Sequence, residues 1–447
     1  MQSIILAIFF CSTLSDFIVQ SFALPPIVRF VPEALSMLVM LYVLVAGTRD
    51  RFRLVAPKYW LVFGALALVI LCGIINSNPG SGPLISGMRF YFRAVPLFFL
   101  AAVFPMTEER LATQLKVLLG LAFIQLPFAA YQRWVVMSEG RFSGDSVAGT
   151  LLDSGILSMF LICAALVLTG LLLKRRIGAR WFLVTFLLML FPTTIDETKV
   201  TVIWLPIGLL VTLMFGADPG KRLRYAGIAV ALLVVFGAIF VPIYDKMEEK
   251  DPNRIDIVDF FTDTQKLDRY LSAHGSNAAK EGLGGKMTAH RGQAALDSLS
   301  YLAKDPVRLT FGLGLGNVSP SQTGKEFEGS YYRLFSNLLV ISFIYFVLEL
   351  GVLGVLLIGV LLWMVFSDSV AVARSDDSLT AALGAGWTGV VAIFAIGMIY
   401  TNFHFFTSVT FLYWYFSGVV CARRMALRLA AARIPRAAVQ PRLSPAR

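Results

Sequence analysis

Residues 150–173 have the sequence TLLDSGILSMFLICAALVLTGLLL, an apolar run in which Asp153 is the only charged residue. Crossing the hydrocarbon core of a bilayer takes roughly 20 predominantly apolar residues in a helix. Lys174, Arg175 and Arg176 follow this run at once. The stretch therefore predicts a transmembrane helix that ends at a basic loop in water.

Similar runs recur along the whole chain. They lie at about 3–22, 28–46, 59–76, 90–106, 115–133, 150–173, 181–195, 199–216, 225–243, 335–366, 385–402 and 403–421. The chain has 447 residues, of which 57% are hydrophobic and 15% charged, against about 25% charged in soluble domains. This composition excludes a soluble enzyme, a nucleic-acid-binding domain and a disordered scaffold. It predicts an all-α integral membrane protein with about twelve transmembrane helices.

The runs divide the chain into four parts. Residues 1–243 hold the first nine spans, 244–334 form a large loop, 335–422 hold the last three spans, and 423–447 form a basic tail. The first run has no signal-peptide cleavage pattern, so we expect it to be a retained span. The run 335–366 is too long for one crossing. We expect a shallow or periplasmic helix first, and then a true span from about Glu349.

The basic residues indicate the orientation. The loops between alternate spans and the C-terminal tail hold 21 Lys and Arg but only seven Asp and Glu. This bias places them in the cytoplasm with both termini, and the loop 244–334 on the outer side. The net charge of the large loop is −1, and that of the remaining outer or membrane-depth residues is −2. The overall net charge is +11, so the cytoplasmic residues carry +14. We predict that the loop is partly helical, with a helix over about 286–304 that ends before Pro306.

Several familiar sites are excluded by spacing. The cysteines Cys11, Cys72, Cys163 and Cys421 lie inside apolar runs and show no metal or redox spacing, and no histidine has a partner at zinc-ligand spacing. Residues 312–316, GLGLG, lack the preceding strand and the following Lys-Ser/Thr of a phosphate-binding loop. They predict a turn that allows close backbone approach. We expect neither a metal nor a nucleotide cofactor.

Cations at membrane depth are functional candidates because burying them is costly. Arg89 and Arg93 are spaced i, i+4, so they share a helix face that suits an anion such as a diphosphate. Arg141 and Arg291 lie in outer loops, where a guanidinium fork could hold a leaving diphosphate. Snorkelling anchors, structural ion pairs and solvated loop charges would account for the same residues. His404 is a candidate general base or, alternatively, an interfacial aromatic-belt residue.

Several motifs taken in order resemble the bacterial O-antigen ligase / O-antigen polymerase family. They are Arg141-Phe-Ser-Gly144, a span that starts near Lys199, and Arg291-Gly-Gln-Ala-Ala-Leu followed by Tyr301-Leu-Ala-Lys-Asp-Pro306. Phe311-Gly-Leu-Gly-Leu-Gly316 and Glu349-Leu-Gly-Val-Leu-Gly354 complete the series. The resemblance covers mainly residues 140–360.

The resemblance implies a glycosyltransferase of the bacterial inner membrane that works at the periplasmic face without metal or nucleotide sugar. Its substrates would be undecaprenyl-diphosphate-linked glycans, and its partners membrane lipids and a chain-length regulator protein. The family's diphosphate-binding cations would fall on Arg291 and Lys199. Lys199 departs from the family's Arg and keeps the charge without the bidentate fork. Ligases also carry His-Asn before the Glu-x-Gly, whereas this chain has Ser336-Asn337, which favours a polymerase over a ligase.

The sequence thus predicts a polymerase for O-antigen, capsule or exopolysaccharide. Arg291, Arg141, Lys199, Arg93 and Arg89 would hold the diphosphate, and Glu349, Asp153 or His404 would take the acceptor proton. The alternatives are an O-antigen ligase that transfers glycan to lipid A-core and, from another class, a polysaccharide or lipid transporter. Related halves are typical of transporters, and the sequence shows no such repeat.

Overall fold

The computed structural model describes residues 1–50, 52–104, 106–137, 147–196, 198–248, 291–321, 324–339, 341–375 and 378–433. Every regular element in these ranges is a helix, so the predicted all-α class is confirmed. The candidate Arg141 lies outside the described residues.

Eight helices of the described residues are long and apolar enough to cross a membrane. They are α1 (Gln2–Ser21), α2 (Val31–Asp50), α3 (Pro57–Ser77), α6 (Glu108–Tyr131), α7 (Ser154–Leu173), α11 (Arg222–Glu248), α17 (Ser342–Ala373) and α18 (Leu379–Gly397). A ninth candidate span is the bent pair α4 (Ser81–Phe92) and α5 (Val95–Val103). These helices are those of a multi-pass membrane protein.

The centre of the bundle is α7, the helix of the opening sequence. In its most apolar window 89% of the residues are buried inside the protein. Gly170 of α7 and Gly386 of α18 bring the two backbones together, because a Cβ on Gly170 would lie 2.2 Å from the carbonyl oxygen of Ala382. Small residues permit such close packing of helices in a bilayer, where the hydrophobic effect adds little.

Two predicted runs are divided differently in the structure. The run 90–106 falls on α4 and α5, which are bent by 43°. Pro96, in the first turn of α5, has no N–H to continue the helix from α4. The run 335–366 falls on α16 (Tyr332–Phe335) and α17, and α17 is broken at Gly351, whose φ is +67°. This break lies two residues beyond the predicted start of the true span at Glu349.

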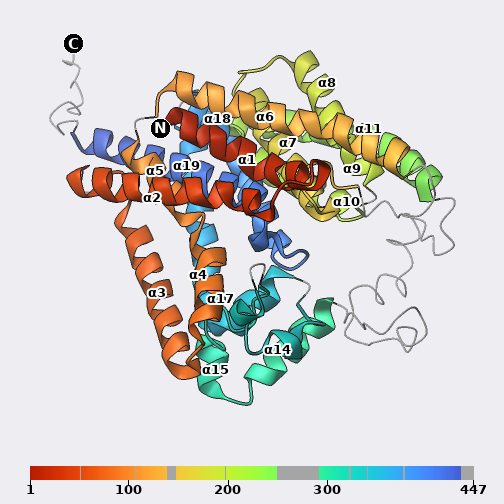
Figure 1. Cartoon of the computed structure of the whole chain (residues 1–447). Coiled ribbons are helices and arrows are strands. Elements are labelled where there is room, and N and C mark those ends of the chain that lie inside the picture. Colours follow the sequence, from red (N-terminus) through yellow and green to blue (C-terminus); the bar gives the residue numbers. More distant parts are fainter. Residues whose placement is uncertain are drawn as a thin grey trace, which may run out of the picture.

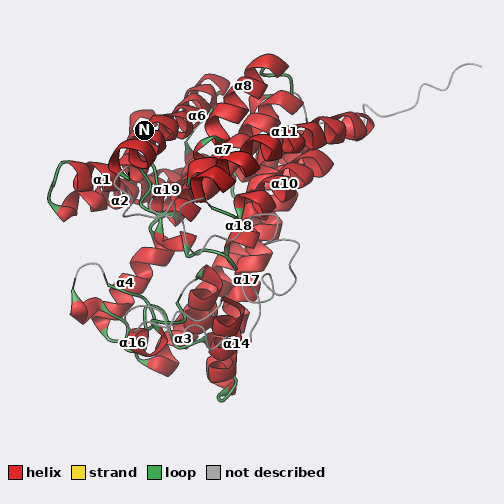
Figure 2. Cartoon of the chain, turned by 90° about the vertical axis from the view of Figure 1, so that its right-hand side faces the viewer, coloured by secondary structure: helices red, strands yellow, loops and turns green. Residues whose placement is uncertain are grey.

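The segment that begins at Arg291 lies in the lower part of Figures 1 and 2, where it contacts α3 and α4. It contains α14 (Arg291–Leu302), inside the predicted helix 286–304, and α15 (Pro306–Phe311). The Gly-rich turn after α15 makes the close backbone approaches that the sequence predicts. A Cβ on Gly316, whose φ is +82°, would overlap the carbonyl oxygen of Pro83 at the start of α4.

The remaining described helices are shorter or more polar. They include α8 (Ala179–Leu190), α9 (Pro192–Ile195), α10 (Thr201–Val211) with the π-helical turn η4 (Thr212–Gly216), and α19 (Thr407–Arg433). The short 3-10 turn η8 (Phe403–Phe405) joins α18 to α19. It carries His404.

Candidate functional site

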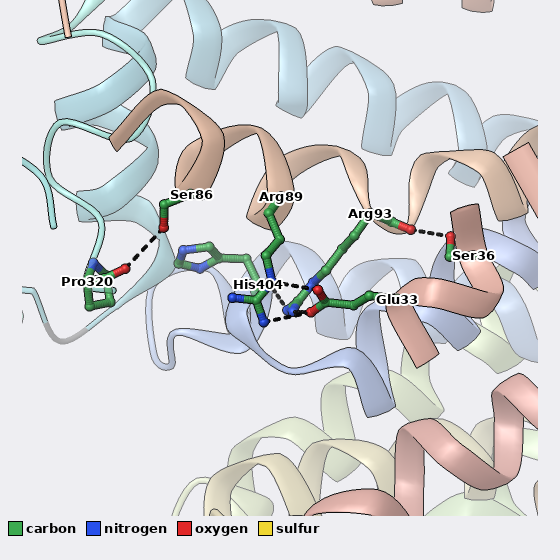
Figure 3. A network of polar contacts seen from close by, with 7 residues as sticks. All are labelled: Glu33, Ser36, Ser86, Arg89, Arg93, Pro320 and His404. Atoms are coloured by element: carbon green, nitrogen blue, oxygen red, sulfur yellow. Dashed lines mark hydrogen bonds and ion pairs between the residues drawn. The ribbon is translucent and has the colours of Figure 1, made fainter. Parts of the chain in front are cut away.

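Two arginines of the bent pair converge on one carboxylate. Arg89 is in the last turn of α4 and Arg93 lies at the break before α5. Nε of Arg89 lies 2.5 Å and Nη1 of Arg93 2.6 Å from the carboxylate oxygens of Glu33 on α2. Figure 3 shows both guanidinium groups turned toward Glu33, with His404 beside them. The predicted shared face of Arg89 and Arg93 is therefore present and holds an anionic group.

The two arginines differ in their access to water. The side chain of Arg93 is 5% exposed and that of Arg89 is 20% exposed, while Glu33 is 12% exposed. Arg89 also lies over the ring of Phe30, 4.5 Å from its centroid. A planar guanidinium stacks on an aromatic face while its N–H groups still bind an anion. Arg89 is thus the more accessible cation of the pair.

His404 lies next to Arg93 in an aromatic cage. Nη2 of Arg93 donates to the backbone carbonyl of His404 at 3.2 Å. The imidazole is 6% exposed and its centroid lies 4.9 Å from the ring of Tyr345 and 5.0 Å from that of Phe346. Burial, and secondarily the positive charge of Arg93, hold the pKa of His404 well below its usual range. The imidazole is therefore neutral at neutral pH.

The two nitrogens of His404 have different surroundings. Nδ1 lies 2.9 Å from Oγ of Ser342, the first residue of α17. Nε2 is buried and has no hydrogen-bond partner among the described residues. In the tautomer whose Nδ1–H donates to Ser342, Nε2 presents a free lone pair. This nitrogen can then accept a proton from a hydroxyl group.

An apolar cavity of about 110 Å³ adjoins the ring of His404. Phe63 of α3, Val95 of α5, Leu361 of α17 and Trp414 of α19 are among its lining residues. Apolar lining with a few polar groups is typical of ligand sites. This cavity suits a hydrocarbon segment, and His404 supplies a polar contact at its wall.

Arg291 contacts the same connection between α18 and α19. It is the first residue of α14, and its Nε donates to the carbonyl oxygen of Tyr400 at 3.1 Å. Its guanidinium carbon lies 4.4 Å from the centroid of the Tyr400 ring. Tyr400 precedes His404 by four residues, so one short connection touches both Arg291 and Arg93.

Lys199 lies just before α10, where its Nζ is 5.8 Å from the ring centroid of Tyr244. The turn that carries it is fixed by Asp196, which is fully buried. Asp196 accepts hydrogen bonds from Oγ of Ser158 at 2.7 Å and from the backbone N–H of Thr198 at 3.0 Å. Trp204 of α10 makes an edge contact with Tyr400, with centroids 5.2 Å apart. The helix that follows the Lys199 turn therefore contacts the connection that Arg291 contacts.

Two of the candidate proton acceptors make contacts typical of structural residues. Glu349 is 1% exposed, and its Oε1 accepts from the backbone N–H of Val318 at 3.0 Å and from Oγ of Ser319 at 2.8 Å. It thus anchors the segment that follows the Gly-rich turn. Asp153 caps α7 by accepting from the backbone N–H of Ile156 at 2.9 Å. Among the three candidates, the geometry favours His404 as the base.

Sequence reasoning did not select Glu33, Ser342 or Tyr400 as site residues. Glu33 carried a usable signal, since an acid inside an apolar run requires a partner. Ser342 and Tyr400 carried none, because they act through a hydroxyl and a backbone carbonyl brought in by tertiary packing. Among the described residues, no group of three or more His, Cys, Asp or Glu side chains is placed to hold a metal ion.

No family model matches the chain, and no curated protein was found to be similar to it.

Proposed function

We propose that this chain is a membrane glycosyltransferase that polymerises undecaprenyl-diphosphate-linked oligosaccharide repeat units. The observation that carries the proposal is the buried His404, which lies between paired arginines and an apolar cavity. Such a site suits a substrate with an anionic head, an apolar chain and a hydroxyl to deprotonate. That this substrate is a glycan on an undecaprenyl diphosphate carrier is inferred from the resemblance of the sequence motifs to the O-antigen ligase / O-antigen polymerase family.

In the proposed reaction an acceptor sugar hydroxyl attacks the anomeric carbon of the donor glycan. The new glycosidic C–O bond forms while the C–O bond to the diphosphate breaks. The hydroxyl proton passes to Nε2 of His404, and undecaprenyl diphosphate leaves with the electron pair. Arg89, Arg93 and Arg291 stabilise the developing negative charge, as fixed cations do in a site that excludes water. Lys199 and Arg141 would contribute further cations.

The same proposal includes the full topology. The eight long spans, the bent pair, Ala179–Ile195, Thr201–Gly216 and α19 would together make twelve crossings. The loops assigned to the cytoplasm contact one another, as in the ion pairs Lys174–Asp218 and Arg176–Glu108. The residues assigned to the outer side likewise pair among themselves, as Glu33 does with Arg89. This separation is what two opposite sides of a membrane would give, and the excess of Lys and Arg in the first set favours the cytoplasm for that side and for the termini.

The test is transfer by purified protein reconstituted in vesicles with lipid-diphosphate-linked repeat units. The wild type should produce a ladder of longer glycans without an ion gradient or nucleotide. H404Q and R291A should shorten or abolish the ladder. R308Q is the matched control, because Arg308 lies in the same segment as Arg291, is 44% exposed and, among the described residues, forms an ion pair only with Asp305. A full-length ladder from H404Q and R291A at equal protein abundance would refute these roles.

A transporter is the rival that one observation favours. Transporters place ligand sites at broken helices, and α4 and α5 form a bent pair with Arg93 at the break. The reconstituted assay separates the two functions. Movement of lipid-linked glycan across the bilayer without any change in glycan length would replace the polymerase by a transporter. Glycan found on lipid A-core, with no lengthened lipid-linked product, would indicate a ligase.

A further inference from the structure

A second cavity lies away from the candidate site, between α10 with its extension η4 and the first half of α11. These helices neighbour one another at the right of Figure 1. The cavity has a volume of about 470 Å³. Ten of its eleven lining residues are apolar, and several expose much of their surface, such as Leu210 and Val230. It is thus an apolar groove on the outside of the bundle.

One end of this groove carries a single charge. Arg222, the first residue of α11, is its only charged lining residue. Nε of Arg222 is buried without a hydrogen-bond partner, and within the described part of the chain its guanidinium forms no ion pair. The nearby carboxylate of Asp218 is taken by Lys221 at 2.9 Å and by Lys174 at 3.6 Å. These two lysines hold the pKa of Asp218 below its usual value.

No acidic residue in the first turn of α11 offsets the positive charge at this end of the groove. A helix N-terminus carries a partial positive charge, so acidic residues are favoured in its first turn. The first turn of α11 contains no acidic residue and instead holds Arg222 and Arg224. The positive charge of Arg222 therefore lies at one end of an apolar groove, with no acidic partner in the first turn of α11. An anion bound there would stabilise this charge.

We propose that this groove binds an anionic phospholipid from the leaflet on the side of the basic loops. The phosphate would contact the guanidinium of Arg222, and one acyl chain would lie along α10 and α11. A phosphate with attached hydrocarbon fits this combination, because basic pockets between membrane helices recognise lipid headgroups. The groove is independent of the proposed glycosyltransferase site.

The experiment compares lipid retention by the full chain in native mass spectrometry, after extraction from vesicles of phosphatidylglycerol and phosphatidylcholine. The wild type should retain phosphatidylglycerol selectively. R222Q should lower that affinity by about fivefold, the contribution of one basic residue near anionic lipid. R224Q is the matched control, since Arg224 is exposed and does not line the groove. A226W keeps Arg222 but fills the groove, so it should also reduce retention.

Each other outcome overturns the proposal. Equal retention by R222Q and the wild type would remove Arg222 from lipid binding. Equal losses in R222Q and R224Q would show general attraction to a basic surface. Displacement of the lipid by glycerol 3-phosphate at equal concentration would show a simple anion site without a chain-binding groove. Retention unchanged in A226W would exclude the groove as the place of the acyl chain.

Discussion

The carboxylate of Glu33 should contribute more to stability than the guanidinium of Arg89 beside it. E33Q removes the only carboxylate that the described residues place on Arg93, whose side chain is 5% exposed. Breaking a buried ion pair by removing one partner costs about 3–5 kcal/mol. R89Q removes two hydrogen bonds to Glu33 but leaves Glu33 bonded to Arg93, so its cost should be about 1.5–3 kcal/mol. The expected difference between the two variants is about 2 kcal/mol.

The assay is the free energy of unfolding in mixed micelles titrated with denaturing detergent. The double variant E33Q/R93Q supplies the control, because it removes the cation that E33Q leaves buried. It should be more stable than E33Q alone, with a coupling energy of about 0.5–3 kcal/mol. Equal losses in E33Q and R89Q, or strict additivity in the double variant, would refute the account of a buried pair.

Three further predictions concern the break of α17 at Gly351, the candidate base His404 and the cap of α7 at Asp153. G351A should destabilise the protein by several kcal/mol, because Gly351 has φ +67° and a Cβ there would lie 2.3 Å from the carbonyl oxygen of Thr310. G359A is the control, because a Cβ on Gly359 of the same helix meets no atom within 4 Å. It should not lower the free energy of unfolding in the same detergent titration. The pKa of His404 is lowered in the folded protein. Its contribution to stability is therefore complete above the unfolded pKa of about 6.5 and is lost as the pH falls below that value. H404Q should flatten the plot of unfolding free energy against pH between about pH 5 and 7, and an unchanged plot would contradict a buried neutral imidazole. D153A should cost about 1 kcal/mol through the lost cap of α7 while leaving glycan transfer intact, and loss of transfer with a normal unfolding curve would instead make Asp153 a functional residue.

The helical fold could be predicted from the sequence because membrane helices satisfy their own backbone hydrogen bonds. A run such as 150–173 needs no distant partner to be recognised as a helix. The division of 90–106 between α4 and α5 depends on Pro96 and on where the backbone bends. A count of apolar residues does not contain that information. The number of crossings therefore stays a prediction, whereas the helical class is confirmed.

The candidate site could be predicted only in part. The i, i+4 spacing placed Arg89 and Arg93 on one face, because both lie in one local segment. Their common partner Glu33 comes from another helix, some 60 residues earlier in the chain, and such pairings arise from tertiary packing. The same applies to Glu349, which was a candidate base by its charge. Only the packed structure shows that its carboxylate is bonded to Val318 and Ser319.

Arg291 and Arg93 both bind the connection between α18 and α19, so a substitution of either arginine can also move His404. Arg291 binds the carbonyl of Tyr400 and Arg93 binds the carbonyl of His404. Between them, the carbonyl of Thr401 accepts from the backbone N–H of Ser342, the residue that also holds Nδ1 of His404. A substitution of Arg291 can therefore displace the imidazole as well as remove a charge. A lowered transfer rate in R291A alone does not distinguish these effects, whereas R291K keeps the charge and loses the planar fork. Recovery of activity in R291K would assign the role to charge, and continued loss would assign it to the geometry that the fork imposes on Tyr400 and, through it, on His404.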